Sequence, residues 1–333
     1  MASPTHPWPD KATIQSAMAL AAWAPSVHNS QPWRWRVRSR SIDLYADMTR
    51  HLTATDPQAR DLLMSCGAAL HHLRVAFRAL GWTGTVRRLP SAADPDHLAT
   101  IDLATHEATA EDFRLASAIP VRRTDRRRYS SWPVPDGLLT QLSALIEDKG
   151  MVLVSVDKPD LRHKLAMDIA KAATLQDASI EYQDELSVWA GMPEGASDGV
   201  PGANIPRLPE PNADLHMRSF PGGELADNEP GDDLDAGVLM VLATLSDDPL
   251  SRLQAGEALS TVLLAATTIG LATCPLTQAL EVTATRELVR TDVLAGWGHP
   301  QFIARIGWAP ISAAPLPPTP RRPITETVEW STA

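Results

Sequence analysis

Residues 24–35 are dense in side chains that donate and accept hydrogen bonds, and they could form a binding loop. Ser26, Asn29 and Gln31 lie between Pro25 and Pro32. The two prolines restrict the backbone, so these polar side chains lose less entropy when a ligand orders them. In an alternative interpretation, the serine and asparagine form only local turn hydrogen bonds.

Residues 121–129 carry a second unusual pattern, with arginine at five of the seven positions from 122 to 128. A phosphate monoester is close to a dianion at neutral pH, and arginine binds it through two parallel N–H groups. The Thr124 hydroxyl offers a further donor. Such a run is also typical of a solvated face or a nucleic-acid patch. The net charge of −10, from 30 basic and 40 acidic residues, weakens the nucleic-acid interpretation.

The usual catalytic motifs are absent from the sequence. No Gly-x-Gly-x-x-Gly, phosphate loop, His-Glu-x-x-His or Cys-x-x-Cys occurs, which disfavours a Rossmann site, a P-loop NTPase and a common zinc site. Without a Gly-x-Ser-x-Gly elbow, an α/β-hydrolase is disfavoured as well. His71 and His72 are adjacent in an expected helix and do not share a face, so we expect no joint metal site.

Composition is that of a globular protein, with 44% apolar and 21% charged residues in 333. This length allows two domains or one large one. Cys66 and Cys274 are too few for a disulfide framework, and we expect both to be buried. No secretory pattern and no membrane-length apolar run occurs, so we expect a soluble cytoplasmic protein.

Apolar spacing and turn residues predict the elements that position the two polar segments. Expected helices cover 11–23, 59–80, 111–118, 136–148, 161–189 and 253–269. Expected strands cover 33–37, 41–46, 99–103, 151–156, 237–245 and 301–308. Between 191 and 231 the chain has seven prolines and seven glycines, about a third of the residues, so a long functional or disordered loop is predicted there.

The expected helices at 59–80 and 253–269 resemble each other at a shift of 189 positions. Gly67, Ala69, Leu70 and Ala76 then fall on Gly256, Ala258, Leu259 and Ala265. Each helix also follows a strand-like run and an Asp-Pro pair. Chance similarity between alanine-rich helices is one interpretation, and a degenerate internal duplication is the other.

The polar loop, read as Ala-Pro-Ser-Val-His-Asn-Ser-Gln-Pro-Trp-Arg-Trp, resembles the FMN-dependent nitroreductase family, and more narrowly its actinobacterial Acg-type branch. The arginine run is similar to the Arg-Arg-Ser-x-Arg-x-Phe segment of that family. The resemblance implies an α+β nitroreductase-like sandwich made of two fused, degenerate halves. Residues 1–105 would form the first half with the flavin-ring loop. Residues 106–333 would form the second, with the phosphate-binding arginines and a lid at 191–231.

The resemblance also implies which residues hold FMN. The ring-contacting loop would supply Pro25, Ser26, His28, Asn29, Ser30, Gln31 and Pro32. The phosphate would bind Arg122, Arg123, Thr124 and Arg126, and the C-terminal basic pair Arg321 and Arg322. The turn near flavin N5 would include Pro275, Leu276, Thr277 and Gln278. Gln278 stands where the family commonly has glycine, so its side chain would crowd the reactive face of the ring.

Each half lacks the motif that the other half has, so the resemblance predicts one composite FMN site per chain and a monomer acting as an internal pseudo-dimer. The implied activity is hydride transfer from NAD(P)H through FMN to an electrophilic small molecule, such as a nitroaromatic or a quinone. The flavin would carry the chemistry, so no catalytic side chain, metal or nucleic-acid partner is expected. The alternative is a protein that holds FMN under a closed lid with little turnover. A basic interaction module without flavin is the third interpretation.

Overall fold

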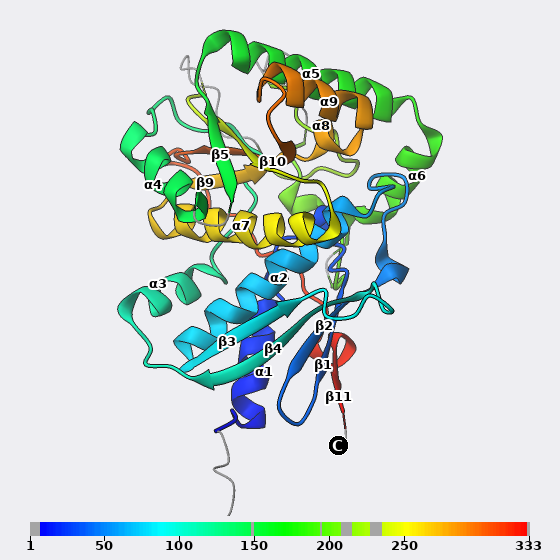
Figure 1. Ribbon diagram of the computed structural model, residues 1–333. Coiled ribbons are helices and arrows are strands. Elements are labelled where there is room, and N and C mark those ends of the chain that lie inside the picture. Colours follow the sequence, from blue (N-terminus) through cyan, green and yellow to red (C-terminus); the bar gives the residue numbers. More distant parts are fainter. Residues whose placement is uncertain (1–6, 148–149, 194, 208–214, 227–234, 332–333) are drawn as a thin grey trace, which may run out of the picture.

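The structure is a computed structural model that describes residues 7–147, 150–193, 195–207, 215–226 and 235–331. Two sheets enclose a middle layer formed by the two longest helices (Figure 1). No helix in these ranges combines the length and the apolar character that a membrane span requires.

The first unit contains a helix, two strands, a long helix and two more strands. These elements are α1 (Lys11–Ala21), β1 (Trp33–Val37), β2 (Ile42–Ala46), α2 (Arg60–Ala79), β3 (Trp82–Arg88) and β4 (His97–Thr105). The strands pair antiparallel in the order β1-β2-β4-β3. Asp10 starts α1 because its carboxylate accepts a hydrogen bond from the Thr13 N–H at 2.7 Å.

The second unit follows α3 (Ala110–Ala118) and repeats this order with insertions. Its elements are α4 (Asp136–Glu147), β5 (Met151–Val156), α5 (Pro159–Asp177), α6 (Ile180–Trp189), β8 (Val238–Thr244), α7 (Pro249–Thr268), β9 (Ala272–Pro275), α8 (Gln278–Glu281), α9 (Thr283–Asp292) and β10 (His299–Gly307). The strands again pair antiparallel, in the order β5-β8-β10-β9. β8 and α7 therefore correspond to β2 and α2, and β9 and β10 correspond to β3 and β4.

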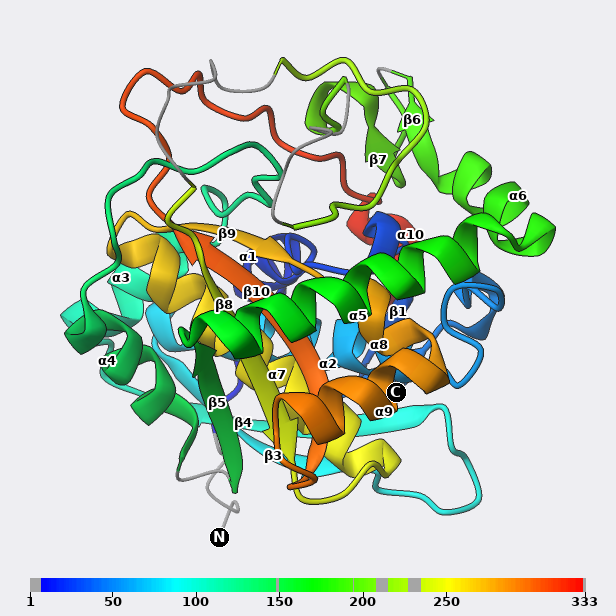
Figure 2. The same cartoon turned by 90° about the horizontal axis from the view of Figure 1, so that it is seen from above.

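The helices α2 and α7 contact each other at two glycines, and Figure 2 shows the two helices beneath α5. A Cβ atom on Gly67 would lie 2.0 Å from the Leu253 carbonyl oxygen, and one on Gly256 would lie 2.0 Å from the Met64 carbonyl oxygen. Only glycine permits so close an approach. Gly67 and Gly256 differ by 189 positions, and so do Met64 and Leu253. The same shift aligns the two helices in sequence. A contact repeated in this reciprocal way is typical of a two-fold axis.

The three largest apolar clusters among the described residues stabilise this arrangement. The first lies between the first sheet and α1 and α2 and includes the fully buried Trp33 and Phe77. A second lies between the inner face of the second sheet and α4 and α7, around Phe302. A third covers the outer face of that sheet, where α5, α8 and α9 pack. Each large apolar side chain buried in this way contributes about 1.5–3 kcal/mol.

The C-terminal segment returns from the second unit to the first. After α10 (Ile324–Thr327), the strand β11 (Val328–Trp330) pairs in parallel with β1 and extends the first sheet. Residues 315–323 run past the loop at 25–31 on the way, which brings the two segments together in the site described below.

Several sequence-based predictions need correction. The single helix expected over 161–189 is two helices, because Ser179 accepts a hydrogen bond from the Tyr182 N–H and starts α6. The strands β3, β9 and β11 were not predicted. Within 191–231, residues 194, 208–214 and 227–231 lie outside the described ranges. The rest is mostly irregular but includes β6 (Ala190–Met192), β7 (Val200–Pro201) and the buried Ile205. Cys66 and Cys274 are buried and free, as expected.

Candidate functional site

A cavity lies at the junction of the two units, the lid segment and the C-terminal segment. Thirteen of the seventeen site residues expected from the sequence line it, and these are Pro25, Ser26, His28, Asn29, Arg122, Arg123, Thr124, Arg126, Pro275, Leu276, Thr277, Gln278 and Arg321. Ser30, Gln31, Pro32 and Arg322 do not line it. Segments nearly three hundred residues apart in sequence thus share one cavity.

The loop at 25–31 has a strained backbone. His28, Asn29 and Gln31 adopt positive φ angles of 48°, 54° and 50°, which non-glycine residues seldom adopt. One hydrogen bond within the loop and one to α2 hold this conformation, since the Gln31 N–H donates to Ser26 Oγ at 3.0 Å and the Val27 N–H donates to Ser65 Oγ at 3.3 Å. The rigid loop predicted from the two prolines is consistent with this geometry.

The Asn29 and Gln31 side chains bind protein groups. Asn29 Nδ2 donates to the carbonyl oxygens of Gly199 and Pro320 at 3.0 and 3.1 Å. Gln31 is fully buried, and its Oε1 accepts a hydrogen bond from the Arg322 N–H at 2.8 Å. Its Nε2 donates to the carbonyl oxygen of Ser197. These contacts fasten the loop to the lid segment and to the C-terminal segment.

His28 is buried, and its tautomer follows from one contact. Arg218 Nη1 lies 2.8 Å from His28 Nε2. Because arginine can only donate, Nε2 accepts, and the proton of the neutral ring lies on Nδ1. Burial lowers the pKa of His28 well below its usual value, and the charges of Arg218 and Arg126 lower it further. The imidazole therefore stays neutral.

Three arginines gather at one end of the cavity without a facing carboxylate. Arg122, Arg123 and Arg321 form no ion pair with any described acidic residue. Nε and Nη1 of Arg122 are buried and unpartnered, and so are Nε of Arg123 and Nε of Arg321. Burial, followed by the charge of Arg123, lowers the pKa of Arg122 to about 10. Burial and the charges of Arg122 and Arg123 lower that of Arg321 to about 9.

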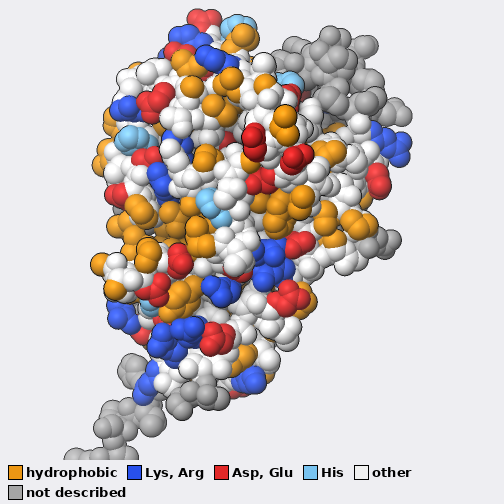
Figure 3. Space-filling model, turned by 90° about the vertical axis from the view of Figure 1, so that its right-hand side faces the viewer, with side chains coloured by type: hydrophobic (Ala, Val, Ile, Leu, Met, Phe, Trp, Pro, Cys, Tyr) orange, Lys and Arg blue, Asp and Glu red, His pale blue; other side chains and the backbone are white. Residues whose placement is uncertain are grey.

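The arginine run divides between cavity and scaffold. Arg126 lies 4.8 Å from the Phe220 ring centroid and donates to the Asn204 carbonyl. Arg127 instead pairs with Asp125 at 2.9 Å outside the cavity. Thr124 bridges to Thr273, which places this segment beside β9. Residues 122–127 do not form a solvated basic face, since Arg122 and Arg127 are buried. Figure 3 shows acidic, basic and apolar side chains intermixed on one face of the molecule.

The segment after β9 forms another wall of the cavity. Gln278 begins α8 and is 5% exposed, and its Oε1 has no hydrogen-bond partner. Thr277 Oγ1 donates to Glu281 Oε1 at 2.6 Å. The expected crowding by Gln278 is consistent with a side chain that lines the cavity.

Sequence reasoning missed several cavity residues. Asp61, Met64 and Ser65 lie on one face of α2, and their i, i+3, i+4 spacing was the available signal. Arg218 and Phe220 come from the lid segment, and no local pattern marked them. Arg218 Nη2 forms an ion pair with Glu281 at 2.5 Å, and its Nη1 donates to the Tyr182 hydroxyl at 2.7 Å. Burial lowers the pKa of Arg218, but the negative charge of Glu281 and its hydrogen bond to Arg218 outweigh this effect and raise the pKa above its usual value.

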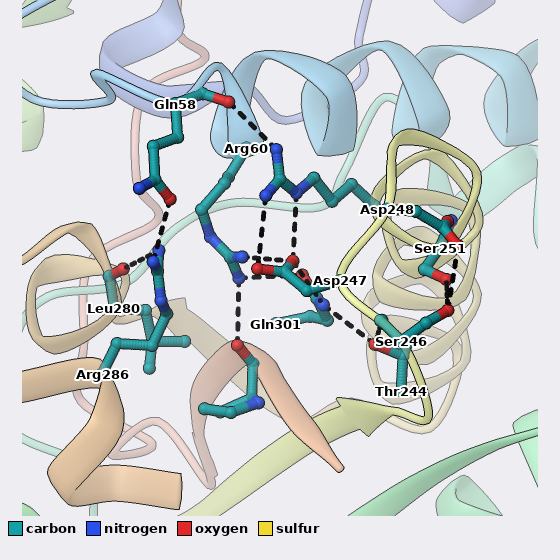
Figure 4. Close-up of polar contacts among 12 residues, drawn as sticks. Gln58, Arg60, Thr244, Ser246, Asp247, Asp248, Ser251, Leu280, Arg286 and Gln301 are labelled. Carbon is teal, nitrogen blue, oxygen red and sulfur yellow. Dashed lines mark hydrogen bonds and ion pairs between the residues drawn. The ribbon is translucent and has the colours of Figure 1, made fainter. Parts of the chain in front are cut away.

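A polar network joins the N-terminal ends of α2 and α7 (Figure 4). Arg60 forms an ion pair with Asp247 and donates to Gln301 Oε1 at 2.9 Å. Arg252 also pairs with Asp247, at 3.0 Å. Burial raises the pKa of Asp247, but the hydrogen bond from Arg252 and the charge of Arg60 outweigh it and bring the pKa to about 2. This network fixes the first turn of α2, from which Asp61 reaches the cavity.

The chain has close relatives among known proteins. A Mycobacterium tuberculosis protein named "Putative NAD(P)H nitroreductase" is 45% identical over 329 residues, covering 98% of this chain and 93% of that protein. A second, "Putative NAD(P)H nitroreductase acg", from the same organism, is 40% identical over 314 residues, covering 94% of each. The solved FMN-dependent nitroreductase NfnB from Mycobacterium smegmatis, in complex with NADPH, gives a TM-score of 0.41 at 17% identity, over 66% of this chain and 99% of that one. No profile of a known protein family matches the chain.

Proposed function

We propose that this chain, which belongs to the NAD(P)H nitroreductase family that includes acg of Mycobacterium tuberculosis, is an FMN-binding oxidoreductase. It transfers a hydride from NAD(P)H, through FMN, to an electrophilic small molecule such as a nitroaromatic or a quinone. Membership of the family follows from relatives that match nearly the whole chain. Support for the cofactor comes from the residues that line the cavity.

The observation that carries the proposal is the group of uncompensated arginines. Three guanidinium groups that repel one another and face no carboxylate destabilise the protein unless an anion joins them. A phosphate group satisfies them, because its oxygens accept the N–H groups that Arg122, Arg123 and Arg321 leave unpartnered. The residues present therefore fit the phosphate end of FMN.

Other residues of this chain fit the remainder of the cofactor. The strained loop at 25–29 and the segment at 275–278 line the same cavity from opposite ends of the sequence. Both are held by backbone and side-chain hydrogen bonds, so little ordering is lost on binding. When bound, FMN supplies the hydride-transfer chemistry. The chain binds and orients it, and the lid segment excludes water through Phe220 and Arg218.

We further propose that the chain is an internal pseudo-dimer with one site, with halves at residues 1–105 and 106–333. The repeated strand order and the reciprocal glycine crossing support two related halves. The loop at 25–31 comes from the first half and the arginines come from the second. A monomer then contains every residue of the site, and sedimentation at micromolar concentration should give a single-chain mass with bound flavin.

A second function, flavin holding with little turnover, is favoured by the contacts of the lid segment. That segment binds the loop through the Gly199 and Ser197 carbonyls, and Asp198 forms an ion pair with Arg50. Arg50 also lies 5.1 Å from the Trp189 ring centroid. A lid fastened at several points opens slowly and limits the access of NAD(P)H.

The test is the visible absorption spectrum of the purified chain, followed by NADPH addition without oxygen. A flavin band that bleaches supports the reductase, and a stable band supports flavin holding. No band after FMN is added refutes both. Asp198→Asn separates the first two outcomes, because a loosened lid should accelerate bleaching if the lid limits it. The deletion of residues 193–230 tests the same point more severely, and retained flavin shows that the deleted form is folded.

A further inference from the structure

Asp61 is a buried carboxyl group that the cavity leaves without a partner. It lies in the first turn of α2, lines the cavity beside Met64 and Ser65, and is 6% exposed. No described residue donates a hydrogen bond to its carboxyl oxygens; the Ser65 hydroxyl donates only to its backbone carbonyl. A buried polar group without a partner is uncommon and calls for a ligand or a functional role.

The two nearest cations are engaged elsewhere. Arg60 donates to Asp247, to the Pro300 carbonyl and to Gln301, as Figure 4 shows for the labelled residues. Arg218 donates to Glu281, His28 and Tyr182. Neither guanidinium therefore hydrogen-bonds Asp61.

The N-terminal amides of α2 are engaged as well. The Arg60 and Leu62 N–H groups donate to Asp56 at 2.7 and 2.8 Å, so they are not available to Asp61. Glu281 accepts from Gln176, Thr277 and Arg218. Burial raises the pKa of Asp56 to about 6, although hydrogen bonds from the α2 amides lower it, whereas the carboxyl oxygens of Asp61 accept no hydrogen bond from any described residue.

This environment favours the neutral carboxylic acid. Burial raises the pKa of Asp61 well above its usual value, and the negative charges of Asp56 and Glu281 raise it further, against the weaker effects of Arg60 and Arg218. A neutral carboxylic acid is a hydrogen-bond donor and can release a proton.

The other titratable groups of the cavity are less suited to this role. His28 is held neutral with Nε2 accepting from Arg218, and its Nδ1 is enclosed by protein atoms. Burial raises the pKa of the Cys274 thiol. Arg122 and Arg321 have pKa values of about 10 and 9 and are assigned to the phosphate. His216 also lines the cavity and is the competing donor. Among the described lining residues, Asp61 is the only carboxyl group.

We propose that the carboxyl group of Asp61 donates the proton that an electrophilic acceptor takes up when it is reduced in this cavity. The inference rests on the proposed function. For a quinone, a hydride originating from the reduced nicotinamide adds two electrons and one proton. The O–H bond of Asp61 breaks, a new O–H bond forms on the acceptor oxygen, and the product is the hydroquinone. The Asp61 carboxylate then takes a proton from water when the cavity opens.

The protonation state is tested directly by infrared spectroscopy of the wild-type chain and Asp61→Asn at pH 7. The difference spectrum should contain the C=O stretching band of a protonated carboxyl group. Asp168→Asn serves as the control, because Asp168 is another buried acid, on α5, outside the cavity lining, and its removal should leave the Asp61 band unchanged. This measurement needs neither turnover nor FMN. Absence of the band overturns the inference.

Proton donation is tested with two acceptors on the FMN-loaded protein. Asp61→Asn should lower kcat for 1,4-naphthoquinone about 100-fold, within the usual contribution of general acid catalysis. Reduction of ferricyanide, which takes up no proton, should stay within about 2-fold of the wild type because no general acid is needed. The dissociation constant of naphthoquinone for the oxidised protein should also change little, since the amide keeps a donor. His216→Gln should lower the naphthoquinone rate much less than Asp61→Asn does.

The outcomes separate the inference from the proposed function. If Asp61→Asn slows both acceptors equally, the residue is structural and the inference fails. If His216→Gln alone abolishes quinone reduction, the donor is His216. If the wild-type protein with bound FMN reduces neither acceptor, the reductase proposal fails and proton donation fails with it. An unchanged FMN affinity of Asp61→Asn confirms that the variant is folded.

Discussion

Replacing Arg122 with methionine should stabilise the protein without FMN and weaken FMN binding, which are effects of opposite sign. Arg122 is 6% exposed, and its guanidinium makes no hydrogen bond to any described residue. Burial, followed by the charge of Arg123, lowers its pKa from the ordinary value of an arginine to about 10. At about 1.4 kcal/mol per pKa unit, this corresponds to a cost of up to about 3 kcal/mol in the cofactor-free chain.

Methionine removes that cost and fills similar space, so we expect a gain of about 1–3 kcal/mol in the free energy of unfolding of the cofactor-free protein. For a chain of this length, each kcal/mol raises Tm by about 2–3 °C. A lost charge-assisted hydrogen bond costs about 1.5–3 kcal/mol, which raises the FMN dissociation constant roughly 10- to 100-fold.

The assays are thermal unfolding of the cofactor-free protein and fluorescence titration with FMN. Arg87→Met is the matched control, because Arg87 is exposed and forms an ion pair with the exposed side chain of Asp102 on β4, and neither quantity should change. Arg122→Lys keeps the charge and should fall between the wild type and Arg122→Met in both. A lower Tm combined with an unchanged FMN affinity in Arg122→Met would refute the assignment of this end of the cavity to phosphate.

Two further predictions concern the scaffold. Gly67→Ala should destabilise the chain by about 3 kcal/mol or more in urea unfolding, since its Cβ would meet the Leu253 carbonyl at 2.0 Å. Gly137→Ala, whose Cβ meets nothing within 4 Å in α4, should be neutral or slightly stabilising, and equal losses in both variants would contradict the helix crossing. Asp247 has a pKa lowered from 3.8 to about 2, so its contribution is present above pH 4 and is lost as the pH falls towards 2. Asp247→Asn should therefore flatten acid unfolding in that range, and an unchanged curve would show that the network in Figure 4 contributes little.

Site residues that belong to a short sequence motif could be predicted, whereas contacts between segments distant in the sequence could not. The loop at 25–29 and Arg122 were found because proline spacing and arginine density are local signals. Gln31 was expected at the flavin but fastens the loop to Ser197 and to the Arg322 backbone. Its role depends on segments that only folding brings together.

The spacing of Asp61, Met64 and Ser65 places them on one face of a helix, but nothing in the sequence indicates that the Asp61 carboxyl group has no hydrogen-bond partner. Arg60 and Arg218 donate to Asp247 and Glu281 instead of Asp61, and Arg218 lies over 150 residues away in the sequence. The strand β11 was missed for a similar reason. Residues 328–330 are too few to show the alternation of apolar and polar residues that indicates a strand. They form a strand because they pair in parallel with β1.

The crossing of α2 and α7 has a consequence for how the two halves can vary. Positions 71 and 260 differ by 189 and therefore correspond, and they meet at the crossing, where His71 Nδ1 lies 2.8 Å from Ser260 Oγ. In a dimer of identical subunits, such a position would meet its own copy, so only residues that pair with themselves would be accepted. A single chain carries two independent codons for the one contact. Histidine can then face serine, and each side of the axis is free to change without altering the other.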